Sequence, residues 1–263
     1  MTAHHDPEHE HDLGLQHDLG TLERRGLSRR MGRRGVLGVL GGLSVVAVAG
    51  CADDSGREIP EETAGPFPGD GSNGPNLLTE SGVVRSDITT SFGSASGVAD
   101  GVPLALRFKV YDLTGDEVEV MAGAAIYAWH CDRDGAYSMY DGAAADENYL
   151  RGVQEADADG WVEFTTIFPG CYAGRWPHVH FEVYESLDTA TSASNKLRTS
   201  QLAFDQDVCE TVYATSGYES SLSNLAQVSL DSDGIFSDGY SLQMATTKGS
   251  VTDGYTATLN VPI

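Results

Sequence analysis

The chain is organised around the stretch Phe168-Pro169-Gly170-Cys171-Tyr172-Ala173-Gly174-Arg175-Trp176-Pro177-His178-Val179-His180-Phe181. Its first half is rich in turn residues, and His178 then opens a run with the composition of a β-strand that extends to Tyr184. In a strand, residues i and i+2 project from the same face, so His178 and His180 should lie side by side. Two imidazoles on one face, with Tyr172 six positions before the first of them, predict a metal site.

Short runs of strand-forming residues, separated by turns, make up most of the chain after residue 51. We expect strands at 104–112, 124–130, 161–167, 178–184, 199–204, 225–230, 239–247 and 255–261, with a short extension at 118–120. The segment 205–223 should be irregular or partly helical. Seven or more short strands without a sustained helical period predict an all-β fold, a two-sheet antiparallel β-sandwich. No internal repeat and no second domain is visible.

Charge is distributed unevenly along the 263 residues. The formal net charge is -23, and residues 1–50 hold six Arg and six Asp or Glu, so the whole excess falls on 51–263. An acidic surface repels phosphate backbones, which makes a nucleic-acid partner unexpected. Five of the eight His lie in the first 17 residues, where a polar tail explains them better than a metal site does.

The first 50 residues have the pattern of an export signal. Arg33-Arg34 precede an apolar run from Val36 to Val48, which is shorter than a membrane span and is typical of a twin-arginine signal peptide. Small residues before Cys51 resemble a bacterial lipobox, which predicts cleavage there and lipid attachment to Cys51. We therefore expect a protein that is lipid-anchored on the outer face of the bacterial cell membrane, or secreted. An ordinary N-terminal membrane anchor is the alternative.

The expected mature chain begins with a tether and an irregular N-terminal arm over residues 51–100, followed by the sandwich domain over 101–263. With Cys51 lipidated, Cys131, Cys171 and Cys209 allow at most one disulfide, and the sequence leaves the pairing open.

Tyr137 and Tyr172 complete a candidate set of four metal ligands with His178 and His180. A phenol has a pKa of about 10, so only a strongly Lewis-acidic ion holds it as phenolate at neutral pH. Fe(III) does this well, whereas Zn(II) and Cu(II) more often take His, Cys or carboxylate. Two alternatives stay open: ordinary half-buried tyrosines, or a copper or zinc site built on the His-x-His pair. His130 is expected to be structural.

Several short motifs, taken together and in this order, resemble those of the intradiol ring-cleavage dioxygenases. They are Gly101-Val102-Pro103-Leu104, Trp129-His130-Cys131-Asp132, Gly135-Ala136-Tyr137-Ser138, Leu150-Arg151-Gly152, and Pro169 to Arg175 with His178-Val179-His180. A lone His-x-His is a weak signal, but the ordered combination is specific. The resemblance extends from about residue 59 to about residue 205.

The resemblance implies mononuclear non-haem Fe(III), held by Tyr137, Tyr172, His178 and His180 with a hydroxide as fifth ligand. Tyr172 matches the axial tyrosinate that leaves when the substrate binds, and Tyr137 the tyrosinate that stays. Arg175 matches the family's active-site arginine, which stabilises negative charge on the ring. The implied reaction cleaves catechol-type diols with O2 to cis,cis-muconate-type dicarboxylic acids.

Gln201 resembles the glutamine that completes the family's pocket. The chain departs from the best-known members, because it has too little sequence before the sandwich for the helical dimerisation region of catechol 1,2-dioxygenases. It is closer to the exported, lipobox-bearing group, so the substituents on the substrate ring stay open. The oligomeric state is open too, with a homodimer as the candidate. A non-catalytic exported β-sandwich binding module that retains the fold is the alternative function.

Overall fold

The computed structural model describes residues 57–115 and 117–263. The predicted signal peptide (1–50), the lipobox and Cys51 lie outside the described residues. Within the described part of the chain, no helix has the length and apolar character needed to cross a membrane.

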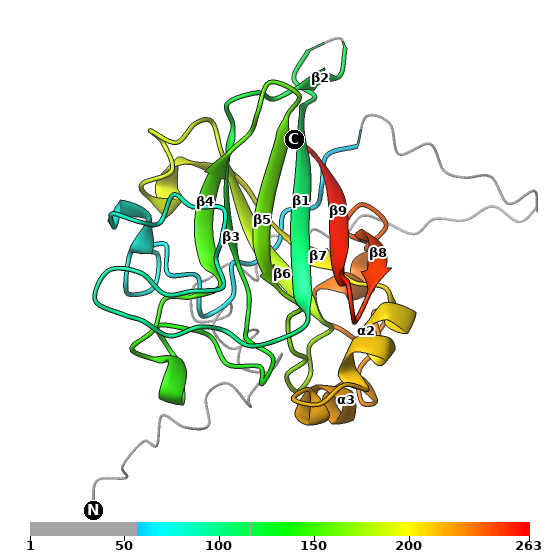
Figure 1. Cartoon of the computed structure of the whole chain (residues 1–263). Helices are drawn as coiled ribbons and strands as arrows, with labels where there is room; N and C mark the ends of the chain where they lie inside the picture. Colours follow the sequence, from blue (N-terminus) through cyan, green and yellow to red (C-terminus); the bar gives the residue numbers. More distant parts are fainter. Residues whose placement is uncertain (1–56, 116) are drawn as a thin grey trace, which may run out of the picture.

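Two β-sheets pack face to face, as the sequence predicts (Figure 1). One sheet has the order β2-β1-β9-β8, and β5 also pairs with β1. The other sheet has the order β4-β3-β6-β7. The strands of the first sheet are β1 (Pro103–Asp112), β2 (Glu119–Val120), β5 (Trp161–Ile167), β8 (Thr246–Ser250) and β9 (Gly254–Pro262). Those of the second are β3 (Ala125–Trp129), β4 (Arg151–Glu155), β6 (His178–Tyr184) and β7 (Lys196–Ala203).

The core between the sheets follows from strand alternation. Every second residue of β1 from Leu104 to Val110 is buried, as a strand with one solvated face requires. Phe108 of β1 meets Phe181 of β6 across the core, with ring centroids 4.9 Å apart. All seven residues of β6 are buried, so this strand is covered on both faces. Its odd-numbered residues face the other sheet, and its even-numbered residues, including both histidines, face the opposite side.

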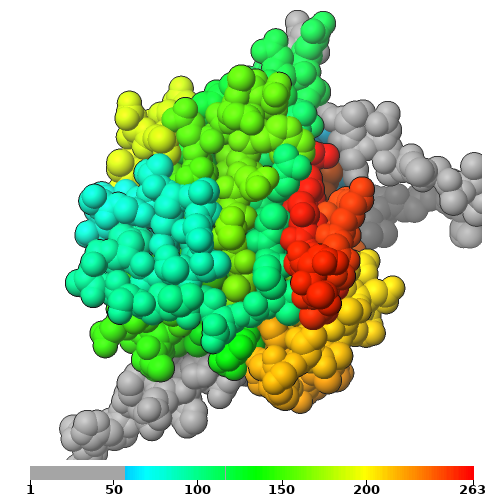
Figure 2. Space-filling view, viewed as in Figure 1, coloured from blue at the N-terminus to red at the C-terminus, as the bar shows by residue number. Residues whose placement is uncertain are grey.

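An irregular N-terminal arm reaches that opposite side, where Gly65 lies against His180. Part of the arm is visible in Figure 2 as the cyan and teal atoms beside the sandwich. The arm is tied to the sandwich at several points along its length. Ile59 N donates to Pro262 O (2.8 Å), Glu62 N donates to Thr199 O (2.8 Å), and Tyr127 Oη donates to Pro68 O (2.7 Å). The arm is therefore an ordered part of the domain that buries the outer face of β3, β6 and β7.

Two helices lie at one end of the sandwich, near the lower end of β1 and β9 in Figure 1. They are α2 (Gln206–Tyr213) and α3 (Glu219–Leu225), in the segment expected to be irregular or partly helical. Asp205 caps α2 by accepting from Asp207 N (3.0 Å). Four 3-10 turns complete the described elements: η4 (Leu77–Thr79), η5 (Gly142–Ala144), η6 (Ala193–Asn195) and η7 (Phe236–Asp238).

Some details of the predicted sandwich are wrong. The strand expected at 225–230 is the end of α3 and the turns after it, because Leu225 packs into the core as the last residue of that helix. The strand expected at 239–247 forms only from Thr246, since a turn from Tyr240 to Gln243 precedes it. β4 was not predicted, and β1 pairs with β9 in parallel rather than antiparallel.

Candidate metal centre

Four side chains converge where β6 meets the turn before it and the loop after β3. The Nε2 atom of His178 is their common neighbour. It lies 3.1 Å from His180 Nε2, 3.3 Å from Tyr172 Oη and 3.4 Å from Tyr137 Oη. All four residues are buried. The structure therefore brings together the four residues that the sequence singled out as candidate ligands.

The spacing of these donor atoms suits one shared ion. Imidazole nitrogens bind first-row metal ions at roughly 2.0–2.1 Å, so two donors of one ion, at angles of about 90–110°, lie roughly 2.8–3.4 Å apart. The three distances to His178 Nε2 fall within that range. The described residues contain no group of three or more His, Cys, Asp and Glu able to hold a metal ion. The cluster supplies two imidazole nitrogens, and its other two donor atoms are the phenol oxygens of the tyrosines.

His178 presents a lone pair to this point. His178 Nδ1 lies 2.5 Å from the carbonyl oxygen of Trp176, which can only accept, so the proton is on Nδ1 and Nε2 carries the lone pair. The ring of His180 stacks on Trp129, its cross-strand partner, with centroids 5.0 Å apart and planes 4° from parallel. Burial, together with the charge of Arg175, lowers the pKa of His178 well below its ordinary value. Burial and His178 do the same to the pKa of His180. Both rings are therefore neutral donors near pH 7.

Tyr137 lies on a tight loop between β3 and β4 that is held by the side chain of Asp141. Asp141 Oδ2 accepts from Tyr137 N (2.7 Å). The preceding Gly135 has φ +92°, and a Cβ there would lie 3.0 Å from Cβ of Tyr172. Glycine thus allows the loop to lie against Tyr172. Burial, and secondly Tyr172, raises the pKa of Tyr137 well above its ordinary value, so only a strongly Lewis-acidic cation would hold it as phenolate.

Tyr172 is positioned by the helical unit, although its sequence neighbours suggested only a turn. Ser221 Oγ of α3 accepts from Cys171 N (2.9 Å), and Asn224 Nδ2 donates to Cys171 O (2.8 Å). Tyr213 Oη donates to Pro169 O (2.9 Å), which holds the start of the same turn. The helices α2 and α3 therefore fix the backbone on which Tyr172 stands.

Arg175 and Gln201 lie together beside this cluster, and both are fully buried. Arg175 Nη2 donates to Gln201 Oε1 (2.6 Å), and Gln201 stands opposite His180 in the β6–β7 register. Arg175 Nε donates to Asp233 Oδ2 (3.0 Å). Sequence patterns did not single out Asp233, which lies in the Asp-, Gly- and Ser-containing segment between the strands expected at 225–230 and 239–247. No local signal marks it, since its partner lies 58 positions earlier in the chain.

Two residues of the arm were missed as well. Gly65 has φ +70°, and a Cβ there would lie 3.3 Å from Cε1 of His180. The ring of Phe67 packs against Tyr137, with centroids 5.2 Å apart. The sequence showed a Pro- and Gly-rich arm at this point. Only the fold shows that the arm covers the cluster.

The remaining His and Cys of the described chain take no part in the cluster. His130 Nδ1 lies 2.7 Å from Cys131 O, and its Nε2 lies 2.7 Å from Thr166 Oγ1, so both ring nitrogens are hydrogen-bonded, in keeping with the structural role expected for it. Cys131, Cys171 and Cys209 are buried free thiols in this structure, with no disulfide among them.

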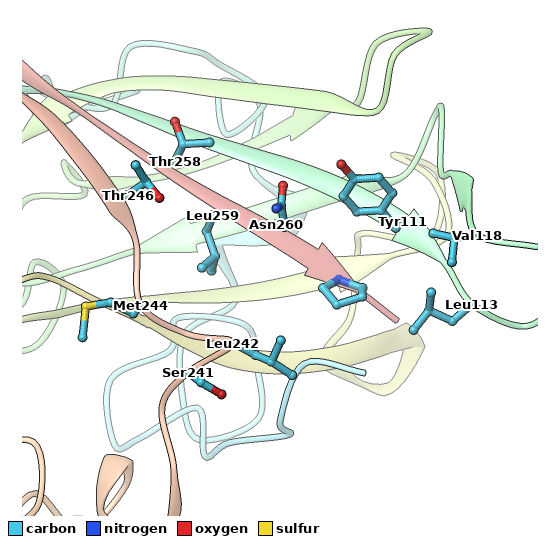
Figure 3. A pocket seen from close by; sticks show the side chains of 11 residues that line it. Tyr111, Leu113, Val118, Ser241, Leu242, Met244, Thr246, Thr258, Leu259 and Asn260 are labelled. Carbon is cyan, nitrogen blue, oxygen red and sulfur yellow. The ribbon is translucent and has the colours of Figure 1, made fainter. Parts of the chain in front are cut away.

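A surface pocket of about 620 Å³ lies elsewhere on the molecule. Figure 3 shows it between the ends of β1 and β9 and the segment 241–246, lined by Tyr111, Leu242, Met244 and Leu259 among others. None of its lining residues belongs to the four-residue cluster. The four-residue cluster and this surface pocket are therefore in different places.

Known proteins are similar to this chain in sequence and in fold. A family model described as "Dioxygenase" matches residues 73–216, more than half of the chain. This chain belongs to the intradiol ring-cleavage dioxygenase family. Catechol 1,2-dioxygenase 1 from Acinetobacter lwoffii is 36% identical over 111 residues, which are 35% of this chain and 34% of that protein. The match therefore spans about a third of the length of that relative.

Solved structures of dioxygenases align over most of the chain. An intradiol ring-cleavage dioxygenase from Tetranychus urticae has a TM-score of 0.60 at 24% identity, over 78% of this chain and 93% of that one. The dioxygenase domain of a dioxygenase carbohydrate-binding protein fusion from Streptomyces sp. SirexAA-E has a TM-score of 0.50 at 21% identity, over 79% and 98%. At these identities the likeness establishes the fold of this family member, a dioxygenase β-sandwich.

Proposed function

We propose that this dioxygenase-family protein uses Fe(III) to cleave catechol-type diols between their two hydroxylated carbons, with O2, to cis,cis-muconate-type dicarboxylic acids. One observation carries the proposal. Two phenol oxygens and a second imidazole nitrogen lie within 3.4 Å of His178 Nε2, in a buried site of a chain that belongs to this family. A binding module without catalysis has no need of that donor set.

The donor chemistry favours ferric iron over zinc or copper. Tyr137 would have to ionise although burial opposes it, and phenolate is a hard donor that a strongly acidic cation stabilises most. Fe(III) would be held there by Tyr137, Tyr172, His178 and His180. A catecholate that chelates this ion would become reactive toward O2 at its ring. The protein's own contribution is to hold four donors in a buried site before the metal arrives.

Tyr172 is the ligand best placed to leave. Its relative exposure is 9%, against 2% for each of the other three, so it borders the more open side of the site. When a diol binds, a displaced Tyr172 oxygen can accept one of its two phenolic protons. Tyr137 lies under Phe67 and is expected to stay.

Arg175 supplies the fixed positive charge. Its guanidinium is fully buried and held by Gln201 and Asp233, so it needs no reorganisation when negative charge develops on the substrate. Gln201 also donates to Thr63 O (3.0 Å), which connects the arm to the same network. Gln201 thus acts by orienting Arg175 and the arm.

The decisive experiment is the visible spectrum of the iron-loaded protein, with and without catechol, together with O2 uptake. Charge transfer from tyrosinate to Fe(III) should give a red-brown protein, and catechol should move the band to longer wavelength while O2 is consumed. A colourless protein after reconstitution with iron would overturn the proposal. A protein that binds iron and catechol but consumes no O2 would support the binding-module alternative.

We also propose export with a lipid anchor at Cys51, on the pattern of Arg33-Arg34, the apolar run and the lipobox. Replacing both arginines by lysine should retain the protein inside the cell. Cys51→Ala should release it from the membrane fraction. Unchanged fractionation of both variants would contradict this proposal and leave the enzymatic one untouched.

A further inference from the structure

Asp233 is a buried carboxylate that neither the motifs nor the four-residue cluster includes. Its relative exposure is 0%, and it lies on the segment after α3, far in sequence from the site. A buried carboxylate is costly unless each oxygen is hydrogen-bonded or paired. Here Oδ2 accepts from Arg175 Nε (3.0 Å) and from Trp176 N (2.7 Å). Oδ1 accepts from Ile235 N (2.8 Å) and Phe236 N (3.2 Å).

These contacts fix the guanidinium of Arg175 from one edge. Asp233 holds the Nε edge, and Gln201 accepts from Nη2 at 2.6 Å on another edge. Gln201 in turn donates to Thr63 O in the arm at 3.0 Å. A planar guanidinium held at two edges can neither rotate nor withdraw, so its position relative to the cluster is set by residues on three separate segments.

Asp233 also connects this network to the walls of the site. Through the hydrogen bond from Trp176 N it fixes the residue whose carbonyl accepts from His178 Nδ1. The backbone that it caps carries Phe236, whose ring centroid lies 6.5 Å from that of His178. Removing the negative charge of Asp233 should therefore displace Arg175 before it displaces any other residue of the site.

We propose that Asp233 is a positioning residue for the dioxygenase reaction: it holds Arg175 in the orientation in which the guanidinium can stabilise charge on the substrate. This inference rests on the proposed function of Arg175. Asp233 itself does not touch the substrate. It acts through Arg175.

A double-mutant cycle on kcat tests this role. Asp233→Asn keeps the shape and removes the charge, and it should lower kcat roughly 10- to 100-fold, as misplacement of a catalytic group by about 1 Å does. KM should change less than about threefold, because the lost interaction belongs to the transition state. In an Arg175→Gln background the same substitution should change kcat less than about threefold.

Glu163→Gln is the matched control. Glu163 pairs with Arg107 Nε at the same distance, 3.0 Å, but on an exposed surface, and it should leave kcat unchanged. An equal fall in kcat for Asp233→Asn in both backgrounds would mean a merely structural role and would overturn the inference. Absence of any turnover in the wild type would overturn the proposed function instead, so the two failures are distinguishable.

Hydrogen exchange gives a second readout that needs no metal. In the metal-free protein the Arg175 Nε–H should exchange slowly, and at least about tenfold faster in Asp233→Ser, which lacks the charge. Serine can still cap Ile235 N, so this variant keeps the local turn if Asp233→Asn fails to fold. An Arg175 Nε–H that exchanges equally fast in wild type and variant would overturn the inference.

Discussion

Each of the four clustered side chains is held by a different local interaction. His178 is fixed by a carbonyl acceptor, His180 by stacking on Trp129, and Tyr137 by the loop bonds to Asp141. Tyr172 depends on its backbone, which α3 clamps at Cys171. Tyr172 is also the most exposed of the four, at 9% against 2% for each of the others, so its ring is the one that we expect to move when a diol binds.

Tyr172→Phe should therefore alter colour and turnover together. Loss of one tyrosinate should weaken and shift the visible band, and kcat should fall by about 100-fold or more because a proton acceptor is lost. Tyr111→Phe is the control, since Tyr111 lies on β1, in the sheet that does not carry the histidines, with its ring beside Lys109. An unchanged spectrum of Tyr172→Phe, measured on iron-loaded protein, would remove Tyr172 from the ligand set.

Glu62 in the arm carries a prediction about pH. Burial and then the charge of Asp238 raise its pKa from 4.5 to about 7, while the hydrogen bond from Gln243 and the charge of Arg175 lower it, and Asp233 raises it further. When folding raises the pKa of a carboxyl, the folded protein loses stability as the pH rises from about 4.5 to about 7. The folded protein then bears the cost of the buried charge at all higher pH values.

Glu62→Gln should therefore stabilise the protein at pH 8 and leave it unchanged at pH 4. We expect a gain on the order of 1–2 kcal/mol at pH 8, after allowance for the partly exposed side chain. Urea unfolding at both pH values measures it, with Glu61→Gln as the exposed neighbour control. Equal stability of Glu62→Gln and wild type at pH 8 would show that the carboxyl is not buried in solution.

At the scale of elements, β6 and the arm together make the site. β6 is buried on both faces, so its Val179, Phe181 and Val183 build the core while its histidines face the arm. A strand with polar residues on its second buried face is stable only if another segment covers that face and satisfies the polar groups. The arm covers that face, and the close approach of Gly65 to His180 is one of its contacts.

Gly65→Ala should disturb the site more than the fold. Both Gly65 (φ +70°) and Gly93 (φ +72°) have a left-handed backbone, but a Cβ at Gly93 would meet nothing within 4 Å. Each substitution should cost about 1 kcal/mol of unfolding free energy through backbone strain. Only Gly65→Ala should also lower the affinity for Fe(III), because its methyl group reaches His180. Equal iron affinities in the two variants would contradict this.

At the scale of the whole molecule, the charge of -23 bears on the choice of substrate. A strongly negative protein lowers the local concentration of anions, and salt screens that field over about 10 Å at 0.1 M. The fixed cation at the cluster, Arg175, is already paired with Asp233. We therefore expect uncharged catechols to be preferred over carboxylated ones.

A comparison of catechol with 3,4-dihydroxybenzoate at two ionic strengths checks this preference. Raising salt from about 10 to about 300 mM should increase kcat/KM for the carboxylated diol several-fold and that for catechol less than about twofold. 4-Methylcatechol serves as a neutral substituted control. The same salt dependence for all three diols would show that the field of the protein plays no part.

Much of this architecture could be predicted from local patterns. The strands β5 and β6 begin and end where alternation and turn residues predict, because the pattern that marks a strand lies within a few consecutive residues. The strand expected at 225–230 failed for the opposite reason: a few apolar residues fit a helix end as well as a strand, and Leu225 packs into the core from α3. β4 is short and has a single apolar side chain, Val153, so its pattern is weak.

The amino-acid sequence by itself determined the candidate ligands Tyr137, Tyr172, His178 and His180, since the period of a strand puts two histidines on one face and the ordered motifs add the tyrosines. Tertiary structure alone decided the supports: Asp233 on Arg175, Gly65 against His180, the helices behind Tyr172, and the parallel pairing of β1 with β9. Side-chain direction follows from neighbours within two or three residues. Which distant segments meet depends on how two sheets, an arm and a helical unit bury their surfaces together, and no short pattern records that choice.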